Sequence, residues 1–244
     1  AGDWTFRVCP TDLQHGPALA SWAVDRLGGT RLGVLYANDA YGRGVLESFR
    51  AAARETTGAE VVTADPYHPA MIDSEEALDP FLERAMARGM DVLMIAGQAD
   101  EALVALRAAR RLGFNGPVIG ADGLTNIAQA GEVAEGVYVS SAFLPDSPRP
   151  DARSFVEAYR ERYDELPDHR GAMTYDAIRL VADAIRDVGT DRDRIRDYVA
   201  DVGDARDAFD GVSGEIAFDA NGDVTGKPIA IGVVRDGQLV TAGS

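Results

Sequence analysis

Short apolar runs alternate with longer amphipathic stretches along the first half of the chain. The apolar runs are rich in β-branched and aliphatic residues and predict buried strands at 31–36, 59–63, 91–96, 117–120 and 136–140. Apolar residues recur at helical spacing over 13–27, 44–57 and 101–112, and over a short segment near Asn126. A further helix is predicted to end at Arg88 and to start either at Ser74 or at Asp79-Pro80. This alternation predicts an α/β fold, a three-layer, Rossmann-like (flavodoxin-like) parallel sheet with helices on both faces.

The second half of the chain has a different pattern. Residues 142–150 contain three prolines and show no periodicity, which predicts a crossing between two lobes. Three helical segments follow at 151–163, 171–188 and 191–202, with no strand between them. Because these helices have no strands of their own to cover, we expect their sheet partner to be missing and the sequence to be truncated at its start.

The C-terminal part is antiparallel in character. The segments 214–218 and 229–235 predict two strands that pair around 219–223, where Asn221-Gly222 is a strong signal for a β-hairpin turn. Asp236-Gly237 predicts a second turn. The tail is therefore expected to form hairpins, unlike the parallel units before it.

The chain is strongly acidic, with a formal net charge of −16 over 244 residues and Lys227 as its one lysine. Affinity for nucleic acid depends on clustered Lys and Arg that neutralise phosphates, so we expect no nucleic-acid partner. An anionic membrane surface is disfavoured for the same reason. The acidic, lysine-poor composition fits a salt-rich habitat or a GC-rich genome equally well.

Known enzyme motifs are absent from the sequence. It contains no Walker A motif, no GxGxxG after a strand, no GxSxG and no HExxH. His15, His68 and His169 lie far apart without Cys or carboxylate neighbours at metal-ligand spacing, and the segment 219–223 lacks the glycine position and the glutamate of a calcium loop. The lone Cys9 lies in an apolar stretch and is expected to be a packed strand residue. The sequence therefore nominates no catalytic residue, no metal and no cofactor, and we expect the protein not to be an enzyme.

A series of short motifs occurs in an order that is known from one receptor family. The run 36–44 is Tyr-Ala-Asn-Asp-Ala-Tyr-Gly-Arg-Gly, a polar loop with Tyr-Gly-x-Gly between a predicted strand and helix. The other motifs are Phe6-Arg7 with Pro10, Asp12, Gln14 and Gly16, the runs 91–97, 113–117, 120–123, 135–137 and 174–177, Phe155 with Tyr159 and Tyr163, and Gly211 with Gly214, Phe218, Asp219, Gly222 and Asp223. Together they resemble the type I periplasmic binding proteins, specifically the Leu/Ile/Val (branched-chain amino acid) substrate-binding proteins of ABC transporters.

The resemblance implies a domain organisation. In that family the chain crosses three times between two Rossmann-like lobes, and the ligand sits in the cleft between them. The match begins near the first crossing, so roughly a hundred residues, a domain-sized piece, of lobe one would be absent. We therefore expect one complete and one fragmentary lobe, with 1–140 plus 211–244 forming lobe two and 141–210 forming a helical fragment of lobe one.

Four residues are candidates for contact with a ligand. In such sheets the ligand binds beyond the carboxyl ends of the strands, where Tyr41, Gly97, Gln98 and Asp122 all lie. The resemblance places Tyr41 over the ligand as an aromatic wall and gives Asp122 the carboxylate that pairs with an α-ammonium, where the family more usually has glutamate. Gly97 would let the ligand approach the backbone, and Gln98 would add a polar contact. The alternatives are local packing for Tyr41, a surface position for Gln98 and a turn-forming role for Asp122.

The function implied by the resemblance is that of an extracytoplasmic solute-binding receptor. It would capture a small amino acid of the branched-chain type, or a related polar solute, between two lobes and deliver it to the membrane permease of an ABC importer. The intact protein would be periplasmic or held at the cell surface by a lipid anchor. Two alternatives use the same fold, namely the extracellular ligand-sensing domain of a membrane receptor and a receptor for amides or urea.

Overall fold

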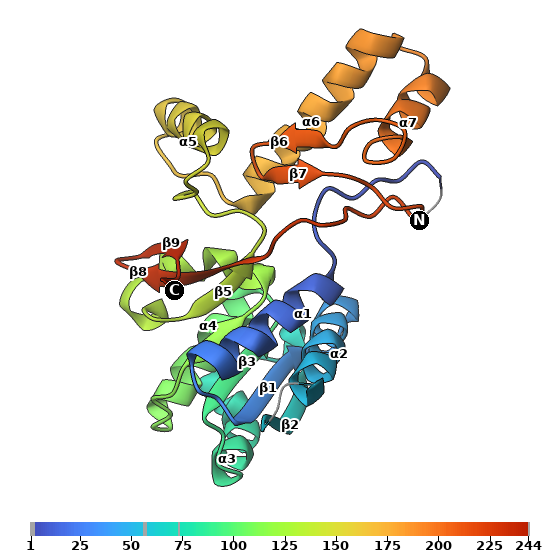
Figure 1. Cartoon of the computed structure of the whole chain (residues 1–244). Helices are drawn as coiled ribbons and strands as arrows, with labels where there is room; N and C mark the ends of the chain where they lie inside the picture. The colour runs from blue at the N-terminus through green and yellow to red at the C-terminus, as the bar shows by residue number, and fades with distance from the viewer. Residues whose placement is uncertain (1–2, 56–57, 73, 244) are drawn as a thin grey trace. The chain divides into compact units, whose positions relative to one another are not determined.

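The computed structural model describes residues 3–55, 58–72 and 74–243 and separates into two compact units (Figure 1). The first, here called the sheet unit, comprises residues 12–141 and 230–244. The second, here called the helical unit, comprises residues 1–11 and 142–229. The chain therefore changes unit three times, after Thr11, Ser141 and Ile229.

The sheet unit is built on one seven-stranded sheet with the order β2-β1-β3-β4-β5-β8-β9. The first five strands of this order run parallel, and they are β2 (Glu60–Tyr67), β1 (Arg31–Ala37), β3 (Val92–Ala96), β4 (Val118–Gly120) and β5 (Tyr138–Ser141). The last two, β8 (Ala230–Arg235) and β9 (Gln238–Thr241), are antiparallel. The predicted α/β fold with a parallel sheet is confirmed.

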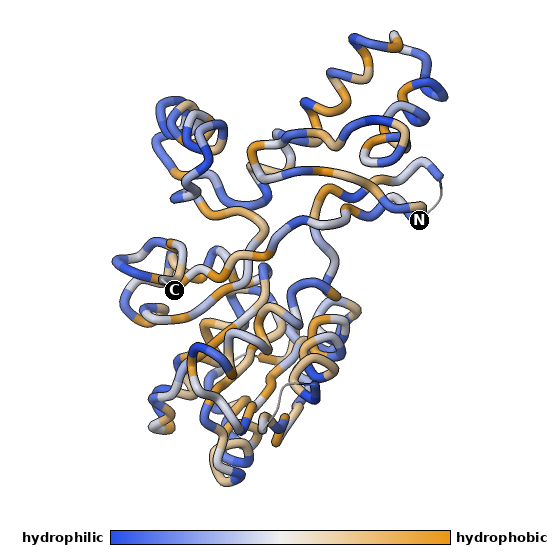
Figure 2. The backbone as a smooth tube through the Cα atoms, in the orientation of Figure 1, coloured by the Kyte–Doolittle hydropathy of each residue, from blue (hydrophilic) through white to orange (hydrophobic). Residues whose placement is uncertain are grey.

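Helices cover both faces of this sheet. One face packs against α1 (Asp12–Ser21), its π-helical continuation η1 (Trp22–Arg26) and α2 (Ala40–Glu55). The other packs against α3 (Asp79–Ala87), α4 (Ala99–Arg111) and the 3₁₀ segment η4 (Asp122–Ala134), with the short turns η2 (Pro69–Met71) and η3 (Glu75–Leu78) before α3. Successive residues of a strand point to opposite faces, so the fully buried β3 must be apolar throughout. Figure 2 shows orange, apolar stretches of backbone at the centre of the sheet unit.

The helical unit contains α5 (Pro150–Tyr163), α6 (His169–Val188), α7 (Arg192–Ala200) and a two-stranded sheet of β6 (Phe209–Gly211) and β7 (Gly214–Ile216). Its buried residues form two small clusters, one around Leu180 and Phe218 and one around Phe143 and Val212. Several large apolar side chains of α6 are exposed, namely Tyr175, Ile178, Val181 and Ile185. In the part of the chain that the structure describes, no helix combines the length and hydrophobicity that a bilayer crossing requires.

The boundaries of the two units differ from the predicted ones. The sequence placed residues 1–11 and 211–229 with the sheet, but both segments pack in the helical unit. The Phe6 ring lies 5.3 Å from that of Phe218, and Arg7 forms a 3.0 Å ion pair with Asp223. Asp176 of α6 accepts hydrogen bonds from the backbone of Val212 and Ser213, which ties the later segment to this helix. The assignment of the units to receptor lobes stays a prediction.

The two segments predicted to pair around Asn221-Gly222 do not pair with each other, although the predicted turn itself is present. β7 pairs with β6, whereas β8 inserts between β5 and β9 in the larger sheet. Residues 219–223 form a tight turn that an isolated antiparallel bridge between Phe218 and Val224 closes, and Asp219 Oδ1 accepts hydrogen bonds from the backbone N–H groups of Asn221 and Asp223. The second predicted turn is confirmed: Asp236 and Gly237 have φ values of 50° and 72° and join β8 to β9.

Cys9 lies outside the strands, contrary to the prediction of a packed strand residue. It is half-buried at a bend, and its Sγ donates to the Pro10 carbonyl at 3.4 Å. The adjoining proline explains the bend, since it lacks the N–H that a continuing ladder would need.

Candidate functional site

The candidate site lies at the carboxyl edge of the parallel strands in the sheet unit. Because β1 to β5 run in the same direction, the residues that follow them meet at one edge. Tyr41, Gly97 and Asp122 follow β1, β3 and β4 respectively, and the structure brings Tyr41 and Asp122 into direct contact. Ligands of open α/β sheets bind beyond this edge, so the position suits a binding site.

Tyr41 joins Asp122 to the backbone of η4. Its hydroxyl donates to Asp122 Oδ1 at 2.8 Å and accepts from the Gly123 N–H at 2.8 Å. Burial, together with the Asp122 carboxylate, raises the pKa of Tyr41 far above its ordinary value. The phenol therefore stays protonated and acts as a fixed donor to the carboxylate.

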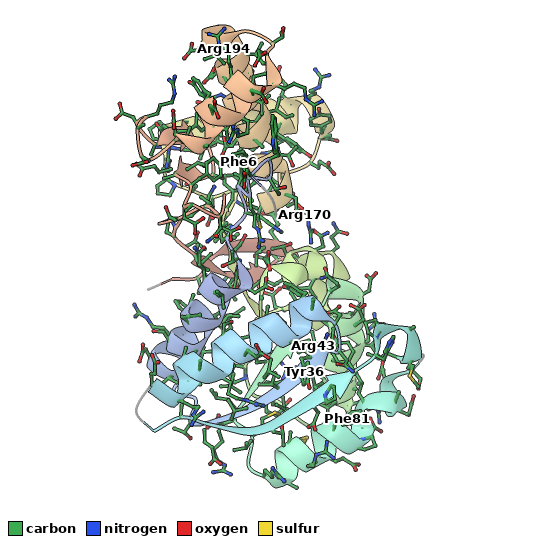
Figure 3. The ribbon with its side chains drawn as sticks, turned by 90° about the vertical axis from the view of Figure 1, so that its right-hand side faces the viewer. Phe6, Tyr36, Arg43, Phe81, Arg170 and Arg194 are labelled. Carbon is green, nitrogen blue, oxygen red and sulfur yellow. The ribbon has the colours of Figure 1, made fainter. Side chains whose placement is uncertain are left out.

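The loop before Tyr41 explains the Tyr-Gly-x-Gly motif. Asp39 Oδ1 accepts from the Gly42 N–H at 2.8 Å and caps the start of α2. A Cβ on Gly42 would lie only 2.8 Å from the Ala37 nitrogen, so a side chain there would collide with β1. Arg43 Nη1 donates to Asn38 Oδ1 at 2.7 Å; Figure 3 labels Arg43 on α2 and Tyr36 on β1, the elements that this loop joins. The glycine thus lets the helix start directly above the strand end and positions Tyr41.

Gly97 and Gly123 permit close packing around this pair. A Cβ on Gly97 would overlap the Tyr67 hydroxyl, and one on Gly123 would lie 2.9 Å from the Tyr41 hydroxyl. Gln98 is exposed at the start of α4, where its N–H donates to Glu101 Oε2 at 3.2 Å. This contact gives Gln98 a helix-capping position; the ligand contacts expected of Gln98 and Gly97 stay predictions.

Two buried residues of this site, His15 and Tyr67, were not predicted from the sequence. His15 of α1 is 1 % exposed; its Nδ1 lies 2.9 Å from Ser140 Oγ of β5, and its Nε2 lies 3.8 Å from Asp122 Oδ2. Burial lowers the pKa of His15 from its ordinary value, against the opposing effects of Asp122 and Asp12. The spacing of Cys and carboxylate residues along the chain did not indicate a site at His15, because its partners Asp122 and Ser140 come from η4 and β5.

Tyr67 is the second such residue. The strand predicted at 59–63 is longer in the structure, where β2 continues through Pro66 to Tyr67. β2 is the edge strand, where a proline is tolerated because its missing N–H costs no ladder hydrogen bond. The Tyr67 ring is buried beside Gly97, and its hydroxyl has no hydrogen-bond partner within the described ranges. Burial raises the pKa of this phenol, so it remains a donor.

The site is centred on the Asp122 carboxylate, whose partners Tyr41 and His15 are uncharged at neutral pH, and Asp12 is a second acidic group that acts on both partners. The two oxygens of Asp122 face different partners, with Tyr41 at Oδ1 and His15 at Oδ2. A carboxylate can accept about four hydrogen bonds, so further donors can be added. Such an arrangement suits a compact cation with several N–H donors.

Comparisons with known proteins agree on one family. The family model described as periplasmic binding protein matches residues 1–238. The Leu/Ile/Val-binding protein homolog 3 of Brucella melitensis is 21% identical over 239 residues, which are 96% of this chain and 62% of that protein. The chain thus spans less than two thirds of this relative's length.

Solved structures are similar over nearly the whole chain. A leucine-binding protein LivK from Thermotoga maritima superposes with a TM-score of 0.86 at 28% identity, covering 99% of this chain and 67% of that one. An ABC transporter substrate-binding protein from Desulfitobacterium hafniense in complex with Leu has a TM-score of 0.81 at 28% identity, covering 97% and 67%. These similarities extend through both units.

Proposed function

Because the chain belongs to the periplasmic binding protein family, we propose that it is the ligand-binding part of an amino acid receptor of an ABC importer. The observation that supports this function best is the Asp122 carboxylate, which Tyr41 holds at the carboxyl edge of the sheet. The leucine-binding proteins among the similar structures support the same ligand class. A small amino acid of the branched-chain type is therefore the proposed ligand.

The proposed binding chemistry rests on the α-ammonium group. An ammonium carries three N–H donors and one positive charge, and Asp122 can accept from it while Tyr41 keeps the carboxylate oriented. A charge-assisted hydrogen bond of this kind contributes about 1.5–3 kcal/mol. Gly97 and Gln98, at the end of β3, are proposed to line the same site.

The proposed partners follow from the same family. The named relatives are binding proteins, so we propose no catalytic role. We propose that the receptor acts outside the cytoplasm and delivers its ligand to the membrane permease of an ABC importer, as the transporter name of one similar structure suggests.

The replacement Asp122→Asn tests this function. We expect leucine, isoleucine or valine to bind the wild type and to bind the variant about 10- to 150-fold more weakly, since about 1.5–3 kcal/mol of charged hydrogen bonding is lost. Titration of the chain followed by NMR measures this ratio, because the method also detects weak binding. Glu47→Gln is the matched control: it removes one exposed carboxylate from α2, the helix of Tyr41, and should leave the affinity unchanged.

Two outcomes of the titration would contradict the proposal. Binding of urea or acetamide without binding of any branched-chain amino acid would show that the ligand class is wrong. Equal affinity of the wild type and Asp122→Asn for leucine would show that Asp122 does not contact the ammonium group.

A further inference from the structure

His15 is a buried titratable group beside the proposed ligand carboxylate, and the binding chemistry described above makes no use of it. The residue lies in the first turns of α1 and is 1 % exposed. Ser140 Oγ at 2.9 Å from Nδ1 fixes the plane of the imidazole ring. The opposite nitrogen, Nε2, then faces Asp122 Oδ2 at 3.8 Å.

The distance between His15 and Asp122 allows two electrostatic states. At 3.8 Å the two atoms are too far apart for a hydrogen bond, and Nε2 has no hydrogen-bond partner among the residues that the structure describes. They are close enough for electrostatic attraction if the ring is protonated, because His15 is buried and the Asp122 side chain is only 16% exposed. A neutral ring does not offset the negative charge of Asp122, whereas an imidazolium would offset it.

We propose that His15 is a positioning residue that makes ligand capture depend on pH: neutral His15 leaves the Asp122 charge to the ligand's ammonium, and protonated His15 competes with that ammonium. This inference rests on the proposed function, because it requires a cationic group of the ligand at Asp122.

The groups around His15 support this role. The charged groups that act on it are Asp122 from η4 and Asp12 from its own helix. β5 contributes Ser140, which is neutral. α2 contributes two hydroxyl groups: that of Tyr41 donates to Asp122, and that of Ser48 donates to the Asp12 carbonyl. Burial is the largest influence and lowers the pKa of His15, so the ring is neutral at neutral pH.

The direction of the pH effect follows from linkage. A bound ammonium adds a positive charge near His15 and lowers the pKa of the ring further, so the free receptor binds more protons than the complex below neutral pH. Affinity must therefore fall as the pH falls through the pKa of His15 in the free receptor. It levels off below the pKa of His15 in the complex.

The test compares wild type with His15→Gln, which keeps a side-chain amide near Ser140 but does not titrate. We expect the dissociation constant for leucine to rise about 3- to 10-fold more in the wild type than in the variant between about pH 7.5 and about pH 5. A second measurement uses the wild type alone and follows its three imidazoles by nitrogen NMR. One imidazole midpoint should move to lower pH when leucine is added.

The outcomes separate this inference from the proposed function. If both proteins bind leucine and their affinities change in parallel with pH, and no imidazole midpoint moves, the role of His15 is wrong while the function stands. If neither protein binds leucine at any pH, the proposed function itself fails. Should His15→Gln not fold, the imidazole titration of the wild type decides alone.

Discussion

Replacing Asp176 with alanine will lower the free energy of unfolding of the helical unit by about 3–5 kcal/mol. The Asp176 side chain is completely buried and accepts hydrogen bonds from the Val212 N–H at 2.7 Å, the Ser213 N–H at 2.8 Å and Ser213 Oγ at 2.6 Å. Lys227, 4 % exposed, donates to the same Ser213 Oγ at 2.7 Å. Alanine would leave two buried N–H groups without an acceptor.

The loss of charge adds to this effect. Burial lowers the pKa of Lys227 to about 8, and the Asp176 carboxylate opposes that shift. Without Asp176, the buried ammonium would lose the carboxylate that does most to offset its desolvation. Asp176→Asn retains one acceptor oxygen and should show an intermediate loss.

The chain's two tryptophans allow the units to be followed separately. Trp4 belongs to the helical unit and Trp22 to the sheet unit, so a Trp22→Phe background reports urea unfolding of the helical unit through Trp4 alone. Asp183→Ala, a more exposed position on the same helix, is the control and should change the unfolding free energy by less than about 0.5 kcal/mol. A loss for Asp176→Ala no larger than that of Asp183→Ala would contradict the account.

Replacing Gly16 with alanine will destabilise the sheet unit by about 1–3 kcal/mol, although alanine is the better helix former. A Cβ at Gly16 would overlap Ser48 Oγ and the Phe49 nitrogen and would lie 2.6 Å from the Ser48 carbonyl carbon. These are mostly backbone atoms of α2, so the two helices would have to separate. The intrinsic preference for alanine, about 1 kcal/mol, is too small to offset that strain.

Gly171→Ala is the matched control for this substitution. Gly171 also lies in a helix, but its nearest neighbours would be 3.5 Å or more from a new Cβ. Alanine there should be neutral or stabilising by up to about 1 kcal/mol. The loss of stability in Gly16→Ala is measured by urea unfolding in a Trp4→Phe background, where Trp22 fluorescence reports the sheet unit. Stabilisation by Gly16→Ala would mean that α1 and α2 do not pack this closely.

The sheet and its helices could be predicted from the sequence because local pattern decides them. A strand such as β3, with both faces buried, must be apolar throughout, and a helix such as α2 shows its apolar face at regular spacing. The Tyr-Gly-x-Gly motif predicted the loop that carries Tyr41 for the same reason, because a side chain at Gly42 would collide with β1, which is close by in the sequence.

Other features depend on contacts between distant segments. The turn at Asn221-Gly222 has the residues of a hairpin, yet β8 finds its partners in β5 and β9. Likewise, the contacts of His15 with Ser140 and Asp122 join three separate elements, and the spacing of these residues along the chain does not predict them. The compact units divide the chain at other positions than the predicted lobes, in part because residues 212–213 donate to a carboxylate on α6.

We propose that the Asp122 carboxylate binds the ammonium group of a small amino acid. The most direct test of this proposal compares leucine with isocaproate, which is leucine without its amino group, on the wild type and on Asp122→Asn. We expect the wild type to prefer leucine by about 10- to 150-fold and the variant to lose this preference. Equal binding of the two compounds by the wild type, or an undiminished preference for leucine in Asp122→Asn, would contradict it.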